Sequence, residues 1–86
     1  MAVQETLNVR ITRATQLLWE GNAASVTSKN VDGPFDVLPM HANFVTLIRG
    51  EPITIKFPDG SAQTHYFKYA VMYVQENSVK IYADFL

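Results

Sequence analysis

The chain contains no cysteine and only two histidines, His41 and His65. The lack of cysteine excludes a disulfide framework and thiolate chemistry, and it suits a reducing compartment. A metal site needs three or four ligands at compatible positions. Two histidines far apart in the sequence, without C-x-x-C or H-x-x-x-H spacing, do not provide that set. We therefore expect no bound metal ion.

Long apolar runs and blocks of like charge are missing as well. No run reaches the roughly 20 apolar residues that cross a bilayer as a helix, and residues 1–6 lack the positive flank and apolar segment of a signal peptide. Lysine and arginine number 7, aspartate and glutamate 8, and the formal net charge is −1. A nucleic-acid-binding protein usually carries a basic patch or stripe. The composition predicts a soluble, cytoplasmic chain that forms one domain, residues 1–86, without a transmembrane segment or a nucleic-acid partner.

The residue types of catalytic sites are present, but not in catalytic patterns. The glycines stand alone at expected turns, so no glycine-rich phosphate loop exists: Gly21, Gly33, Gly50 and Gly60. No serine lies in a G-x-S-x-G context, and the carboxylates are scattered, most of them at turns. Nucleophilic catalysis requires a hydroxyl or thiol close to a base. We therefore expect no catalytic residue, no cofactor and no enzyme activity of this chain by itself.

Alternation of apolar and polar residues runs through most of the chain. Leu7, Val9 and Ile11 alternate with polar residues, which is the period of a strand with one buried face. Further strands bounded by turn residues are expected at 16–20, 23–29, 35–38, 44–48, 51–57, 62–69, 70–75 and 79–84. No segment keeps a 3.6-residue period. The pattern predicts an all-β fold, a two-sheet, mostly antiparallel β-sandwich of about eight to ten short strands.

The stretch 33–48 contains the most elaborate connection in the chain. It joins two strand segments through a break at Pro39 and a polar corner, 39–43. Two interpretations of His41 stay open: its ring bonds to nearby backbone and fixes the loop, or it contacts a partner. His65 lies on an expected strand, and we interpret it as a surface or half-buried side chain.

Aromatic residues gather in the last third of the chain: Tyr66, Phe67, Tyr69, Tyr73, Tyr82 and Phe85. On the segment 64–74, alternation places Met72 on one side and Tyr73 on the other, each with further apolar residues. A half-solvated strand does not require two apolar sides. Either the strand is buried on both faces, or a bulge at Ala70 switches its facing, or an apolar patch is presented to a partner.

Three segments match the pattern of one known family. The first, 7–21, ends in an aromatic residue, one further residue and a glycine; the second, 33–48, is similar to G-x-x-G-[IV]-x-P-x-H-x-P-x-x-T; the third, 66–84, forms the closing strands. Six positions of the second segment are in register: Gly33, Val37, Pro39, His41, Ala42 and Thr46. On these residues the chain resembles the N-terminal β-sandwich domain of the epsilon subunit of F-type ATP synthases, which is the delta subunit in mitochondrial naming.

The chain also departs from the pattern of that family. Asp36 stands at its second glycine, Pro34 where relatives often have an acidic residue, and Asn43 at the proline after the histidine. Tyr69 and Ala70 occupy the positions of a Gly-Gly pair. Because a Cβ disfavours positive φ, these replacements mark a divergent member.

The resemblance implies a noncatalytic piece of the rotor central stalk. Such a domain binds the gamma subunit along one side and sits on the polar loops of the membrane c-ring, peripheral on the inner, cytoplasmic face of the cell membrane as part of the F1 sector. It transmits torque and helps couple ion translocation to ATP synthesis. Partner contacts are expected, by resemblance, at Pro34, Asp36, Pro39, Met40, His41, Asn43 and Phe44.

Family members usually continue into a hairpin of two α-helices that can bind ATP or inhibit hydrolysis. This chain ends at residue 86, so the resemblance implies that it lacks these two functions. Two rival hypotheses stay open. One is a stand-alone interaction β-sandwich without the motor role. The other is a small sandwich that binds a carbohydrate or another ligand in a concave aromatic pocket.

Overall fold

The computed structural model describes residues 5–40 and 43–84, and all regular structure in this part of the chain is strand. The strands follow one another as β1 (Leu7–Arg13), β2 (Gln16–Ala23), β3 (Ser25–Asn30), β4 (Gly33–Val37), β5 (Phe44–Arg49), β6 (Pro52–Lys56), β7 (Ala62–Tyr66), β8 (Tyr69–Gln75) and β9 (Ser78–Ala83). The all-β prediction is confirmed. Within the described residues, no helix long and apolar enough to cross a membrane is found.

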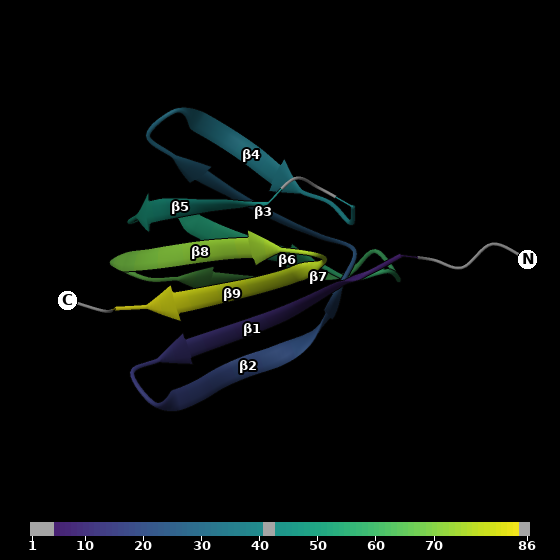
Figure 1. The fold of residues 1–86 in the computed structure, drawn as a ribbon, viewed down its shortest axis with the longest axis horizontal. Coiled ribbons are helices and arrows are strands. Elements are labelled where there is room, and N and C mark those ends of the chain that lie inside the picture. The colour runs from purple at the N-terminus through teal and green to yellow at the C-terminus, as the bar shows by residue number, and fades with distance from the viewer. Residues whose placement is uncertain (1–4, 41–42, 85–86) are drawn as a thin grey trace, which may run out of the picture.

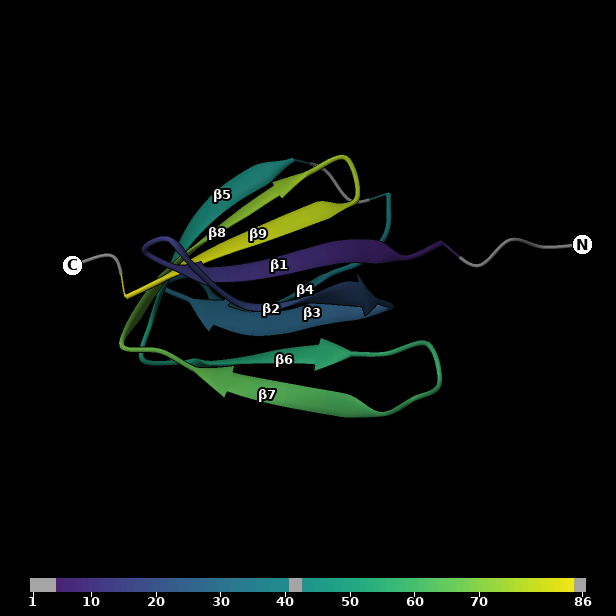
Figure 2. The same ribbon diagram turned by 90° about the horizontal axis from the view of Figure 1, so that it is seen from below.

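The strands form two sheets that pack as layers (Figures 1 and 2). One sheet has five strands in the order β2-β1-β9-β8-β5, and the other has four in the order β4-β3-β6-β7. Neighbouring strands are antiparallel except β1 and β9, which are parallel. This arrangement confirms the two-sheet, mostly antiparallel sandwich. It also places the last strand in the middle of its sheet.

The core lies between the layers and is built from the apolar half of each alternating pattern. Ile11 and Ile81 are fully buried in the five-stranded sheet, and Ile53 and Ile55 are fully buried in the four-stranded sheet. Burying a side chain of this size contributes roughly 1.5–3 kcal/mol. The alternation that gives each strand one apolar face therefore also provides the buried side chains that hold the two sheets together.

One glycine has a different role from the one expected. The sequence predicts that Gly21 lies in a turn that ends the second strand, but β2 continues through it to Ala23. A Cβ at Gly21 would lie 2.7 Å from Cζ2 of the Trp19 ring. Gly21 is therefore needed because the indole lies against the backbone, and the prediction of a turn there is wrong.

The other turn glycines agree with the prediction. Gly33, Gly50 and Gly60 have φ angles of 117°, 68° and 92°. This is the left-handed region, which a residue without a Cβ adopts at little cost.

The apolar segment in the last third of the chain is split between the two sheets. β7 belongs to the four-stranded sheet and β8 to the five-stranded sheet, so the chain crosses over at Phe67 and Lys68. Within β8, Ala70 and Met72 are fully buried, whereas Tyr73 is 43% exposed. The predicted strand 62–69 is thus too long, and Ala70 is not a bulge. One face of β8 is core and the other is a half-exposed apolar face.

Candidate interaction surface

An apolar strip lies on the outer face of the five-stranded sheet. Tyr73 and Tyr82 are about equally exposed, and Val45 is the most exposed member at 57%. The strip consists of Val45, Leu47, Val71, Tyr73 and Tyr82. Its members are cross-strand partners, because Val45 pairs with Tyr73, Leu47 with Val71, and Val71 with Tyr82. Directly opposed side chains on one face are close enough to touch, so the strip is one continuous surface across β5, β8 and β9.

The outer face of the four-stranded sheet is polar instead. Asp36, Thr27, Thr54 and Thr64 lie in one row across its strands. The Thr27 hydroxyl donates to Asp36 Oδ1 at 2.6 Å, and the hydroxyls of Thr54 and Thr64 are 3.2 Å apart. A face of hydrogen-bonded hydroxyls is suited to water. The apolar strip is therefore the side of the sandwich that would gain by being covered.

Cations border the apolar strip. Lys80 is the cross-strand partner of Tyr73, and Arg10 is the partner of Lys80 one strand further on. At the other end of β8, the Arg49 guanidinium carbon lies 5.8 Å from the centroid of the Tyr69 ring. The surface around the strip therefore favours a partner that carries carboxylates beside apolar side chains.

The corner that precedes β5 lies at one end of this surface. Both ribbon views place the start of β5 beside the β8–β9 turn (Figures 1 and 2). Met40 is 77% exposed and has a φ of 66°, and its N–H donates to Asn77 Oδ1 at 2.6 Å. The N–H of Glu76 donates to Asn43 Oδ1 at 3.1 Å. Side-chain hydrogen bonds therefore join the corner to the turn.

The seven residues expected at partner contacts lie in different places. Met40 and Asn43 adjoin the β8–β9 turn, and Pro39 beside them is half-buried. Pro34 and Asp36 are exposed on β4, in the other sheet.

The remaining two expected contacts differ from these. The Phe44 ring packs against the core and meets the Phe35 ring edge to face at 5.9 Å. His41 lies outside the described residues, so neither interpretation of it is tested. The other five expected residues lie on two surfaces, the corner and the outer face of β4, rather than on one.

Sequence reasoning missed the part of the surface that β5 contributes. Phe44 and Ile48 point inward, whereas Val45 and Leu47 are exposed members of the strip. The signal in the sequence was the segment 44–48, which has apolar residues at both odd and even positions. These residues could not be divided between core and surface without knowing that β5 is an edge strand with only one covered face.

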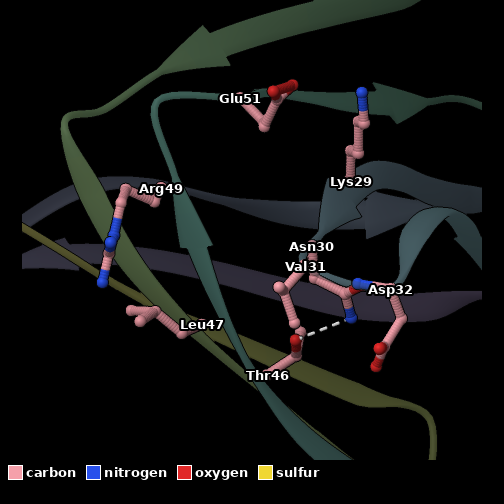
Figure 3. Close-up of a pocket in the computed structure, with 8 residues that line it drawn as sticks. All are labelled: Lys29, Asn30, Val31, Asp32, Thr46, Leu47, Arg49 and Glu51. Carbon is pink, nitrogen blue, oxygen red and sulfur yellow. Dashed lines mark hydrogen bonds between the residues drawn. The ribbon is translucent and has the colours of Figure 1, made fainter.

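A cavity of about 420 Å³ opens between β5 and the β3–β4 turn (Figure 3). The Asn30 amide donates to the Thr46 hydroxyl at 2.9 Å across its floor. Its lining residues are Lys29, Asn30, Val31, Asp32, Thr46, Leu47, Arg49 and Glu51. The lining mixes charged and polar side chains with the apolar Val31 and Leu47 and contains no aromatic ring, so this cavity gives no support to the hypothesis of a carbohydrate pocket.

His65 lies on the opposite side of the sandwich, within a cluster of rings. Its imidazole stacks on Phe67 at 6.1 Å and lies 6.4 Å from the Trp19 ring. Burial lowers the pKa of His65, because the charged form loses water. Among the described residues, no group of three or more histidine, aspartate or glutamate side chains is placed to hold a metal ion.

The fold and this surface define a small β-sandwich with one polar outer face and one outer face that carries an apolar strip. The family of the ATP synthase delta/epsilon chain, β-sandwich domain, matches residues 6–86, and the chain belongs to this family. The recognised resemblance is therefore confirmed.

Curated relatives give the same result. The chain is 33% identical over 73 residues to an ATP synthase epsilon chain of Nitratiruptor sp., a match that covers 85% of this chain and 57% of the relative. It is 29% identical over 79 residues to the epsilon chain of Psychrobacter cryohalolentis, with 92% and 57% covered. The chain thus spans a little over half the length of these relatives.

Solved structures resemble the fold at low sequence identity. A chain of the Euglena gracilis mitochondrial ATP synthase, a structure of OSCP, F1 and c-ring, has a TM-score of 0.85 at 15% identity, with 96% of this chain and 53% of that chain covered. A chain of the Tetrahymena thermophila mitochondrial ATP synthase, central stalk and c-ring, has a TM-score of 0.74 at 12% identity, with 95% and 66% covered. At these identities the likeness establishes the shared fold.

Proposed function

We propose that this chain acts as one domain and is a noncatalytic central-stalk subunit of a rotary F-type ATP synthase. It binds the gamma subunit and the c-ring and helps couple ion translocation to ATP synthesis. The observation that carries this proposal is membership of the delta/epsilon family over residues 6–86. In this role the chain is peripheral to the inner face of the cell membrane, on the cytoplasmic side, and is held there through the complex.

The gamma subunit covers the apolar strip in this proposal. Tyrosines in the middle of an apolar patch are the side chains that most often contribute strongly to protein binding. Tyr73 occupies that place on β8, the central strand of the strip, and Tyr82 lies on the neighbouring strand β9. The cations beside the strip would pair with carboxylates of gamma. Burying the strip removes apolar surface from water, which favours association.

The c-ring contacts a different part of the domain. Of the two surfaces that carry expected contact residues, the corner adjoins the apolar strip, and the outer face of β4 with Pro34 and Asp36 in the other sheet is the part that meets the c-ring. Two surfaces suit two partners. The domain between them is closely packed, and packed interiors deform little, so it would transmit torque as a rigid wedge.

Binding of purified gamma subunit from the same organism tests this function. We expect the unmodified chain to form a stable complex and Tyr73→Ser to weaken it about tenfold or more, as for a side chain at the centre of an interface. Tyr66→Ser is the matched control, because Tyr66 is 74% exposed on β7 of the other sheet. We expect it to change the affinity by less than about twofold.

Three results would count against the proposal. If the folded, unmodified chain forms no complex with gamma at micromolar concentration, the stand-alone interaction domain is favoured instead. Equal losses for Tyr73→Ser and Tyr66→Ser would remove the apolar strip from the interface. Binding that is lost in His41→Ala but kept in Tyr73→Ser would place gamma at the corner alone.

A further inference from the structure

The corner and the β8–β9 turn are joined by the amides of two asparagines. Asn77 Oδ1 accepts the Met40 N–H at 2.6 Å, and Asn77 Nδ2 lies 3.8 Å from the Met40 sulfur as a donor. Asn43 Oδ1 accepts the Glu76 N–H at 3.1 Å. These bonds run in both directions between segments more than 30 residues apart, because the sequence separations are 37 and 33. The corner is therefore fixed at both of its described ends.

The Asn77 side chain is not needed for the turn in which it lies. Glu76 and Asn77 have φ angles of 47° and 64°, the conformation of a two-residue hairpin turn that glycine also satisfies. Its amide instead holds Met40, whose φ of 66° is unfavourable for a residue with a side chain. Such a conformation persists where surrounding contacts maintain it. The amide of Asn77 is one such contact.

The corner is continuous with the apolar strip. Asn43, Val45, Tyr73 and Gln75 are among the residues that line one shallow hollow at this end of β5 and β8. Met40 is the most exposed apolar residue among the described residues of the corner, and its flexible thioether can adapt to the surface of a partner. A large apolar side chain held outward beside an apolar strip extends that strip.

We infer that Asn77, together with Asn43, is a positioning residue that fixes the corner so that Met40 and the apolar strip form one binding surface for the gamma subunit. This inference rests on the proposed function. Neither asparagine needs to touch the partner. Each acts through the backbone of the segment that it holds, and Met40 makes the contact.

The first experiment uses the chain alone and measures amide hydrogen exchange of Met40. Asn77→Gly keeps a backbone suited to the turn and removes the side chain, so exchange of the Met40 amide should become about tenfold faster, the effect of one lost hydrogen bond. Asn77→Asp keeps the acceptor oxygen and tolerates positive φ. It should leave the exchange within about threefold of the original. Unchanged exchange in Asn77→Gly would overturn the inference.

The second experiment measures affinity for gamma. Asn77→Gly and Met40→Ala should each weaken binding about fivefold to tenfold. The double variant should be no weaker than Met40→Ala, because both changes remove the same contact. Asn77→Asp should bind like the original chain.

The outcomes separate the inference from the function on which it rests. If the original chain binds gamma and Asn77→Gly binds equally well, the positioning role is wrong and the proposed function stands. Independent, additive losses in the double variant would likewise contradict the inference. If the original chain does not bind gamma, the proposed function fails, and the role in binding fails with it, whatever the exchange experiment gives.

Discussion

At the scale of single residues, His65 has the clearest electrostatic environment. Gln63 Nε2 and His65 Nε2 are 2.8 Å apart, which is a hydrogen bond when the imidazole is neutral and accepts at Nε2. The rings of Trp19 and Phe67 flank it from the opposing sheet and from the crossover. Arg13 borders this cluster, because its guanidinium lies over the Phe67 ring and pairs with Asp84. Within residues 5–40 and 43–84, no carboxylate forms a salt bridge with this imidazole, and desolvation alone accounts for its lowered pKa.

We predict that acidification destabilises the fold through His65. Its pKa is lowered by burial, so the unfolded chain, with a histidine pKa of about 6.5, binds the proton more strongly. The free energy of unfolding must then fall as the pH decreases through about 6.5 towards the lower pKa of the folded state. Urea unfolding at pH 7.5 and 5.5, followed by Trp19 fluorescence, measures this loss.

The pH effect should shrink in His65→Gln and persist in His41→Gln, which removes the other histidine. Carboxylates that titrate in the same range contribute equally to both variants and cancel in the comparison. The same pH dependence in the original chain and in His65→Gln would contradict the assignment.

At the scale of elements, the four-stranded sheet depends on a bond beyond its backbone ladder. Ser28 on β3 is 5% exposed, and its hydroxyl donates to the carbonyl of Pro52 at 2.9 Å. Pro52 is the first residue of β6 and has no N–H to offer its neighbours. The serine hydroxyl thus joins β3 to the first residue of β6 and helps to fix the register between these two strands.

We predict that Ser28→Ala lowers the free energy of unfolding by about 1 kcal/mol, the usual contribution of a buried hydrogen bond. Thr64→Ala on the exposed face of β7 is the control and should change it by less than about 0.5 kcal/mol. Urea unfolding measures both changes in the free energy of unfolding from the shift of the midpoint, if the dependence of this free energy on urea concentration stays the same. A larger loss in the control than in Ser28→Ala would show that the polar outer row, rather than the buried serine, joins these strands.

At the scale of the whole molecule, the first and the last described strands, β1 and β9, pair in one sheet. β9 lies between β1 and β8, so Ile81 is the cross-strand partner of both Ile11 and Met72. The β1–β9 pairing cannot form until nearly the entire chain is present. Folding dominated by such distant pairs is slow for the size of the chain. The central strand β9 should fold and unfold together with the rest of the domain in one cooperative transition.

We predict that Ile81→Ala lowers the free energy of unfolding by about 2–5 kcal/mol. A chain of this length has roughly 4–13 kcal/mol in total, so the variant should be close to unfolding at 37 °C. Tyr82→Ala, at the exposed residue next to Ile81, should lower the free energy of unfolding by less than about 1 kcal/mol. Thermal unfolding followed by circular dichroism compares the two. Similar costs at both positions would mean that the core does not lie on the Ile81 side of β9.

The sequence by itself determined the strands and most of the turns. Alternation depends only on neighbouring residues, so the segment that became β1 was recognisable without its partners. The isolated glycines Gly33, Gly50 and Gly60 marked turn positions, and the structure gives each of them a positive φ. The family was also recognisable, because the motif of the segment 33–48 is local in the sequence. The corner, residues 39–43, was predicted from the same segment.

Only the tertiary structure decided which strands pair and which faces remain open. The crossover at Phe67 and Lys68 and the parallel β1–β9 pair depend on contacts between distant residues. The apolar strip and the Asn77 contact with Met40 do as well. A local pattern states that a side chain is apolar, but its exposure depends on whether another layer covers it. That is a property of the assembled sheets.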